Sequence, residues 1–141
     1  MPSTPREVFQ RMQQQWFGEP APLTGDLLTE DVVVETPFSP AGSPNRRIEG
    51  RQRFLEVINP QRAAFPVRFD GCRTLAVHDT TDPDTIVVEY ELTGTSPVTD
   101  RPATARFIGV LTTRDGKIAR WREYQDRAAI AQALGVTSPV S

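Results

Sequence analysis

Apolar residues recur along this chain at two spacings, one typical of helices and one typical of strands. Near the N-terminus, Val8, Met12 and Trp16 follow one another every four residues, as on one face of an amphipathic helix. Thr4 stands where an N-cap residue would begin that helix. The pattern therefore predicts a helix over residues 5–17.

The rest of the chain is divided by turn residues into shorter segments of both kinds. Three further helices are predicted, over Leu23–Leu28, 51–58 and 128–134. Extended segments rich in β-branched residues are predicted over 31–38, 66–78, 84–95, 103–114 and 117–125. Asp115 and Gly116 separate the last two as a two-residue hairpin turn, because both positions of such a turn tolerate positive φ.

The order of these elements predicts an α+β fold, because helices come first and a long run of antiparallel strands follows. Helices packed on a strongly curved antiparallel sheet can form a cone-shaped α+β barrel enclosing a cavity, where a small-molecule site is expected. At 141 residues, the chain is expected to be one domain. Its core is expected over about 5–135, with a loose tail at 136–141. The proline-rich segment 37–44 is either a lid over the cavity or a simple connection.

Composition narrows the possible partners. The net charge of −2 argues against binding to nucleic acid, and the chain has no apolar stretch of the roughly 20 residues that span a membrane. Cys72 is the only cysteine and His78 the only histidine, so neither a disulfide nor a metal site is expected. We expect a cytoplasmic protein without a metal or other cofactor. Cys72 is interpreted as a buried, inert thiol and His78 as an exposed side chain.

The last predicted strand carries the candidate chemistry. Trp121, Glu123 and Gln125 share one face of it, and Arg122 and Tyr124 lie on the other. If the first face points inward, Glu123 is an acid in an apolar pocket and a candidate general acid or base. A register shifted by one residue would instead place Glu123 outside. With Glu123 inside, Trp121 would be a wall of the substrate site or simply core, and Gln125 would orient Glu123 or the ligand.

The neighbouring strands add further candidates by the same alternation. Tyr90 is expected to face the cavity, which leaves Glu89 and Glu91 outside in ion pairs with strand arginines. Phe107 and Gly109 share an inward face. Gly109 either widens the pocket by lacking a side chain or marks a bulge.

Three segments together carry a family resemblance. They are the run Asp31–Phe38, the sequence Ile48-Glu-Gly-Arg51, and the hairpin from Asp115 to Tyr124. With them the chain resembles the SnoaL-like group of the nuclear transport factor 2-like superfamily. That superfamily includes ketosteroid isomerases, SnoaL-type polyketide cyclases, limonene epoxide hydrolase and the phenazine-biosynthesis A/B proteins. The resemblance implies the cone fold and a homodimer formed through the outer face of the sheet.

The same resemblance implies which residues surround the site. The end of the chain looks most like that of the phenazine A/B proteins, in which the matching glutamate is thought to be an acid/base, so Glu123 takes that role. Thr36 stands where the isomerases have their catalytic base, and Val34 shares its face. Gly109 aligns with their second acid, and the tyrosine of their first helix falls near Trp16 or Gln15. The isomerase machinery is therefore missing, and Glu123 remains.

These observations predict a small cofactor-independent enzyme acting on an apolar cyclic or polyketide-like metabolite. The expected reaction is an isomerisation, cyclisation, dehydration or condensation with Glu123 as general acid/base. The alternative is a dimeric module that binds a small molecule, or assists another protein, without chemistry.

Overall fold

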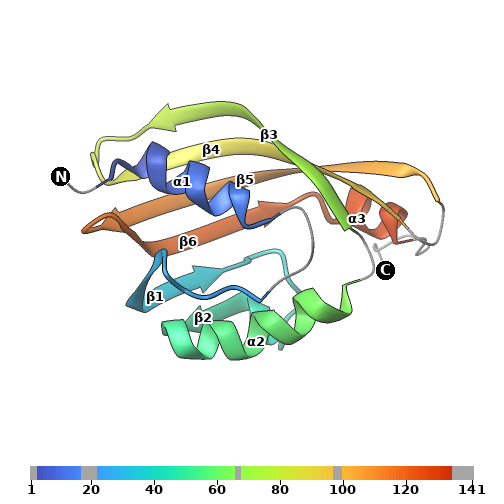
Figure 1. Ribbon diagram of the computed structural model, residues 1–141, viewed down its shortest axis with the longest axis horizontal. Coiled ribbons are helices and arrows are strands. Elements are labelled where there is room, and N and C mark those ends of the chain that lie inside the picture. The colour runs from blue at the N-terminus through green and yellow to red at the C-terminus, as the bar shows by residue number, and fades with distance from the viewer. Residues whose placement is uncertain (1–2, 17–21, 66–67, 97–99, 135–141) are drawn as a thin grey trace.

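In the part of the chain that the structure describes, three α-helices pack against a six-stranded sheet (Figure 1). The computed structural model describes residues 3–16, 22–65, 68–96 and 100–134. The helices are α1 (Pro5–Gln14), α2 (Arg51–Ala64) and α3 (Arg127–Ala133), with a 3-10 turn, η1, at Pro44–Arg46. The strands are β1 (Leu28–Glu35), β2 (Arg47–Glu49), β3 (Arg68–Asp79), β4 (Thr85–Thr95), β5 (Pro102–Arg114) and β6 (Lys117–Gln125).

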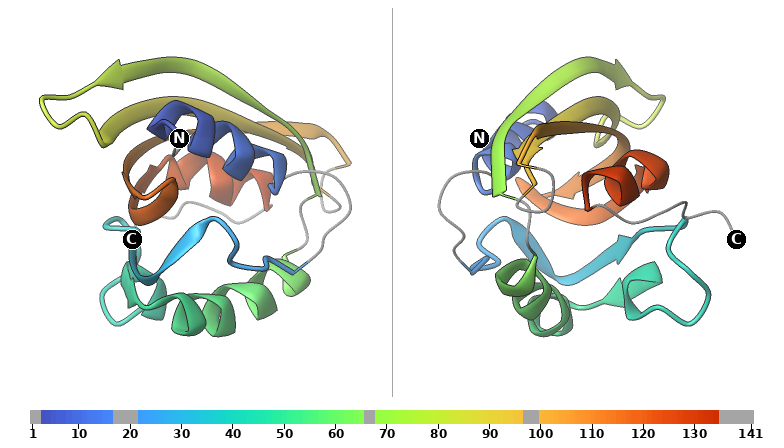
Figure 2. Two further views of the ribbon diagram at one scale, coloured as in Figure 1. Left: turned by 60° about the vertical axis from the view of Figure 1, so that its left-hand side comes forward. Right: turned by 90° about the vertical axis from the view of Figure 1, so that its right-hand side faces the viewer.

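The sheet is curved and does not close on itself. Its strand order is β2-β1-β6-β5-β4-β3, so β2 and β3 form the two edges. Figure 2 shows the strands curling around α1, while α2 lies along β1 and β2 at the other end of the sheet. This is the predicted α+β cone. One pairing differs from the expected antiparallel sheet, because β1 runs parallel to β6 with Val34 opposite Trp121.

Helix α1 begins as its sequence predicts. The Thr4 side chain accepts a hydrogen bond from the backbone N–H of Glu7, whose carboxylate accepts one from the backbone N–H of Thr4. This capping box satisfies N–H groups that the first turn leaves without partners. Val8 and Met12 are buried on the face toward the sheet. The helix ends at Gln14, and the final predicted position, 17, lies outside the described residues.

The helix predicted over Leu23–Leu28 is wrong. Gly25 adopts φ +84° in a turn that the backbone N–H of Leu28 closes by donating to the Gly25 carbonyl at 3.0 Å. Leu28 then begins β1, opposite Ile118. A left-handed glycine ends any local helical path. Leu28 instead joins β1 and the core, and Leu27 packs against that core.

Helix α2 continues past the predicted end at residue 58. Pro60 lies inside it, although proline lacks the N–H that a helix interior uses. Tertiary contacts hold the extra turns: the Asn59 amide bonds the backbone N–H and carbonyl of Leu23, at 2.8 and 3.1 Å. The Arg62 guanidinium donates to the Gln15 carbonyl at 3.1 Å.

The hairpin between β5 and β6 forms at the predicted place. Asp115 and Gly116 have φ values of +54° and +76°, so both turn positions are left-handed. This turn sets the register of β6 against β5, in which Glu123 lies opposite Gly109 and Leu111 opposite Trp121. The inner face of β6 therefore joins a core whose buried members include Phe9, Val32, Val88, Tyr90 and Leu111.

Candidate functional site

A cavity of about 570 Å³ opens between α1, α2 and the concave face of the sheet. We call it the large chamber. Most of its wall is apolar, from Met12, Ile48, Phe54 and Ile58 among others, and polar groups come from Gln15, Thr36, Asn45 and Gln61. Its size is in the range of ordinary small-molecule sites.

Glu123 lines this chamber from β6. Trp121, on the same face, is 7% exposed, whereas Arg120 on the other face is exposed. The structure thus places Glu123 on the inner face, with Trp121 and Gln125 beside it, and the alternative register is not the one formed. The observed pairing of β6 with both β1 and β5 determines this orientation.

Both oxygens of the Glu123 carboxylate accept hydrogen bonds. The Tyr90 hydroxyl donates to Oε2, and the Gln125 amide donates to Oε1 at 2.9 Å. Burial raises the pKa of Glu123 above its ordinary value, and these two donors, with Trp121, oppose the rise. The group is therefore a positioned acid whose proton affinity is increased by its apolar surroundings.

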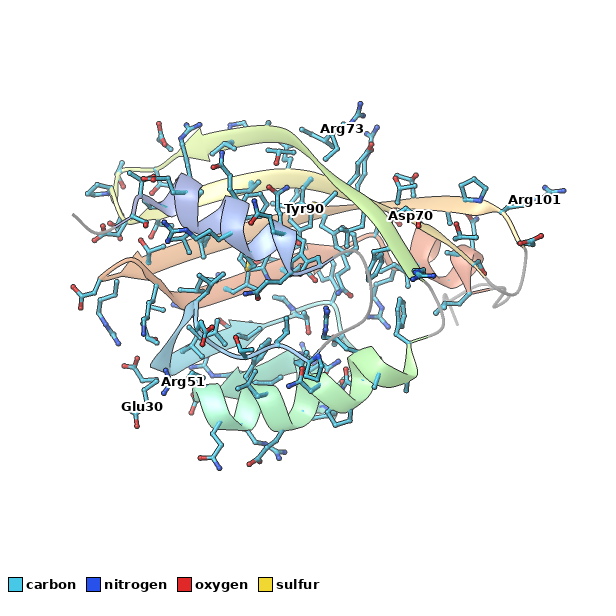
Figure 3. The ribbon with its side chains drawn as sticks, in the orientation of Figure 1. Glu30, Arg51, Asp70, Arg73, Tyr90 and Arg101 are labelled. Atoms are coloured by element: carbon cyan, nitrogen blue, oxygen red, sulfur yellow. The ribbon has the colours of Figure 1, made fainter. Side chains whose placement is uncertain are left out.

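Tyr90 lies behind Glu123 and does not line the chamber. Its ring is fully buried, stacked on Phe107 with centroids 5.3 Å apart and in contact with Phe9 at 5.6 Å. Figure 3 shows it on β4 beneath α1, in the interior of the protein. Desolvation and the adjacent Glu123 charge raise the pKa of this phenol well above its usual range, so it is a neutral donor. The prediction that Tyr90 faces inward is confirmed, but its contact is with Glu123 and not with the cavity.

Gly109 neither widens the cavity nor marks a bulge, the two roles predicted for it. A Cβ atom there would lie 2.1 Å from Cη2 of Trp121, so the indole occupies the space that the missing side chain leaves. Gly109 pairs regularly with Val88 and with Glu123, which excludes a bulge. It makes room for Trp121 and does not widen the cavity.

A second cavity of about 310 Å³ lies under α3. We call it the small chamber. Phe107 lines this chamber, together with Leu92, Ala105 and Ile130. The structure therefore assigns Phe107 to the neighbouring cavity and not to the large one.

The remaining predicted residues line the large chamber. Trp16 borders both chambers, while Val34 and Thr36 line the large one from β1 and the residue that follows it. The Thr36 hydroxyl donates to the Asn45 carbonyl at 2.5 Å and lies 2.8 Å from the Ser39 hydroxyl. Thr36 thus anchors the loop that follows β1.

Sequence reasoning missed the polar side chains that α2 and η1 bring to the chamber. The Asn45 and Gln61 amides bond each other twice, each bond 2.8 Å long. Arg62 also lines the chamber, and burial lowers the pKa of its guanidinium. Gln61 and Arg62 follow Pro60, beyond the predicted end of the helix, so the pattern offered no reason to place them at the site.

Three strand glutamates, Glu35, Glu89 and Glu91, lie on the outer face of the sheet. Glu35 contacts three arginines, at 3.2 Å for Arg47, 2.9 Å for Arg120 and 3.3 Å for Arg122. Although partial burial opposes ionisation, the bonds from Arg120 and Arg122 lower the pKa of Glu35. These contacts mark a structural ion-pair cluster on the outer face.

The expected outward pairing of the β4 carboxylates is confirmed for Glu91, which contacts Arg106 at 3.6 Å. Glu89 also faces outward, but its partner is His78 at 2.6 Å. His78 is more than half exposed, as predicted.

Cys72 accepts a hydrogen bond from the Gln13 amide at 3.2 Å, and burial raises the pKa of its thiol, so it is not an activated nucleophile. Within the described ranges, no three His, Cys, Asp or Glu side chains are grouped as a metal site requires. None of the helices in those ranges is long and apolar enough to cross a membrane.

Comparison with known proteins agrees with this architecture. A family model described as the SnoaL-like domain matches residues 9–121. The uncharacterised protein YesE of Bacillus subtilis (strain 168) is 30% identical over 112 residues, which cover 78% of this chain and 73% of that protein. An uncharacterised PhzA/B-like protein of Pseudomonas aeruginosa is 32% identical over 110 residues, covering 78% of this chain and 75% of its own.

Solved structures of similar proteins share this fold. A provisionally named isomerase from Bacillus subtilis superposes with a TM-score of 0.80 at 26% identity, covering 93% of this chain and 92% of the other. An LEH-like epoxide hydrolase of M. tuberculosis superposes with a TM-score of 0.62 at 19% identity, covering 91% and 86%. At the latter identity the likeness concerns the fold alone.

Proposed function

Because this chain belongs to the SnoaL-like domain family, we propose that it is a small cofactor-independent enzyme that moves protons on an apolar, ring-containing or polyketide-like metabolite. Glu123 is its general acid/base. One observation supports this above all: a carboxyl group lines an apolar chamber, held by Tyr90 on one oxygen and by Gln125 on the other. A catalytic role is also supported by fold neighbours that include a provisionally named isomerase and an LEH-like epoxide hydrolase.

The geometry suggests how Glu123 would act. Its carboxylate takes a proton from carbon next to a substrate carbonyl and returns it to another position, so no electron is gained or lost and no cofactor is needed. The raised pKa increases the proton affinity of the carboxylate and makes it a stronger base at neutral pH than an exposed glutamate. Tyr90 and Gln125 are positioning residues, since they hold the carboxylate in one orientation.

A hydrogen-exchange experiment tests this proposal. Cyclic ketones are incubated with the protein in D2O, and deuterium incorporation next to the carbonyl is followed by NMR. Glu123→Gln should slow enzyme-catalysed exchange by about 10²–10⁴-fold, the usual contribution of one acid/base group. Glu89→Gln, on the outer face, is the matched control and should keep the wild-type rate.

The alternative is a binding module without chemistry, which the mainly apolar chamber wall also permits. Such a protein would be stabilised against heat by the same ketones but would exchange no protons. Equal exchange rates for wild type and Glu123→Gln would reject the enzymatic role of this residue.

A further inference from the structure

The two chambers meet at the candidate acid/base. Among the described residues, six line both of them: Trp16, Arg62, Phe65, Phe69, Glu123 and Gln125. Glu123 and Gln125 come from the end of β6, and the small chamber beside them is lined by Ile130 and Ala133 of α3. A ligand bound beside Glu123 can therefore extend into the large chamber and into the small chamber.

The two directions differ in chemistry. The large chamber carries the neutral amides of Asn45, Gln61 and Gln15, each of which has both donor and acceptor groups. The Thr36 hydroxyl and the side chains of Arg62 and Arg68 add further donors to its wall. Asn45 and Gln61 bind each other in a fixed orientation. Neutral amides suit a hydroxyl or carbonyl group on the ligand, which can exchange hydrogen bonds with both kinds of atom.

The small chamber is shaped by small and apolar residues. Gly94, Ala103, Ala105 and Ala133 leave its space open, and Leu92, Phe107, Ile130 and Leu134 complete the wall. Thr104 is the polar residue that belongs to this chamber and not to the large one. Such a wall favours an alkyl or aryl group and disfavours a polar one, whose hydrogen bonds with water would be lost.

We propose that both chambers hold one elongated ligand, with an oxygen-bearing ring in the large chamber and an apolar tail in the small chamber. Its reacting carbon lies between them, beside Glu123. This inference names the substrate class for the proposed enzyme and rests on that function only for the reacting carbon. The tail-binding role of the small chamber can be tested without turnover.

The protein contains its own reporter for the test. Its two tryptophans, Trp16 and Trp121, both line the large chamber, and Trp16 also borders the small one. Binding of a series from phenol to para-octylphenol can therefore be measured by tryptophan fluorescence. In the wild type, affinity should rise about fourfold for each added methylene until the small chamber is full, and then level off.

Filling the small chamber should abolish that rise. Ala105→Phe places a ring inside it and should make the affinities for phenol and para-octylphenol nearly equal, while phenol itself binds as in wild type. Arg106→Phe is the matched control, since the Arg106 side chain is 72% exposed on the outer side of the same strand. It should keep the full dependence on tail length.

A second variant guards against misfolding of the first. Ala133→Leu fills the same chamber from α3 and should shorten the tail length at which affinity levels off. An unchanged tail dependence in both variants, or no tail dependence in the wild type, would overturn the proposal. Glu123→Gln should leave the tail dependence intact, so loss of proton exchange in that variant bears on the proposed reaction alone.

Discussion

At the scale of single residues, the site depends on an acid whose surroundings oppose its charge. Glu123 is enclosed by apolar side chains, and burial raises its pKa above the ordinary value of 4.5. The hydroxyl of Tyr90 and the amide of Gln125 limit that rise by donating to the carboxylate. The proton affinity of this acid is thus a balance between desolvation and two placed donors.

This balance predicts how stability depends on pH. Because the folded pKa is raised, the folded state binds this proton more tightly than the unfolded chain. The stabilisation from Glu123 is therefore complete below about pH 4.5 and is lost as pH rises through the folded pKa. Urea unfolding should show the stability of wild type, relative to Glu123→Gln, falling across that range. A relative stability that rises with pH would contradict the raised pKa.

Removing the Tyr90 hydroxyl, one of the two donors to Glu123, should extend this loss of stability to higher pH. Tyr90→Phe deletes a hydrogen bond that lowers the pKa of Glu123, so the fall in stability should continue to higher pH. Tyr124→Phe, which removes a hydroxyl from the outer face of the same sheet, is the control and should leave the pH profile unchanged.

A side chain added at Gly109 should also destabilise the protein, because the Trp121 indole fills the space next to this glycine. Gly109→Ala would force a methyl group against the Trp121 indole and should lower the free energy of unfolding by about 1–3 kcal/mol, as overpacked cores do. Urea denaturation measures the loss. Gly71→Ala is the matched control, because a Cβ at Gly71 meets nothing within 4 Å. Equal stability of the two variants would contradict this account.

At the scale of elements, ion pairs hold β1, β2 and β6 together in addition to the backbone hydrogen bonds between these strands. Glu35 ends β1, and its side chain is only 16% exposed. Its partners lie on β2 and on β6: Arg47 on the first, Arg120 and Arg122 on the second. The Glu35 carboxylate thus connects the parallel strands β1 and β6 to the edge strand β2.

Neutralising that carboxylate should weaken the junction. Glu35→Gln removes the charge that three arginines share and should cost about 1.5–3 kcal/mol of stability, the range for hydrogen bonds to a charged group. Chemical denaturation of Glu49→Gln gives the comparison, because Glu49 is 66% exposed and contacts Arg47 alone among the ion pairs found here. The control should lose less than about 1 kcal/mol.

At the scale of the whole molecule, helices cover the concave side of the sheet and its cavities, whereas residues on the convex side are exposed. Ile108 is 44% exposed on that outer side, and Phe38, 59% exposed, contacts Tyr124 edge-on. The outer carboxylates Glu89 and Glu91 are paired within the chain. We propose that this face joins two copies of the protein in a homodimer.

Sedimentation at micromolar concentration tests the dimer. The wild type should have twice the chain mass, and Ile108→Glu should have the mass of one chain, because it places a charge on the apolar part of the face. Gln52→Glu, an exposed change on α2, should remain dimeric. A wild type with the mass of one chain would reject the proposal.

The sequence by itself determined what depends on short-range order. Alternation with a period of two placed Glu123 with Trp121 and Gln125, the Thr4 capping box began α1, and Asp115-Gly116 made the hairpin. Each of these follows from backbone geometry within a few residues, so a local pattern is enough to predict it. The three segments of the family resemblance then indicated the cone.

Tertiary structure alone decided which distant residues meet. Tyr90 reaches Glu123 across β5, and Gly109 leaves space for an indole on the next strand. Helix α2 passes Pro60 because Asn59 is held by Leu23, which brings Gln61 to the large chamber. These contacts depend on the register between strands and on the curvature of the sheet, two quantities to which all the strands contribute and which no local pattern contains.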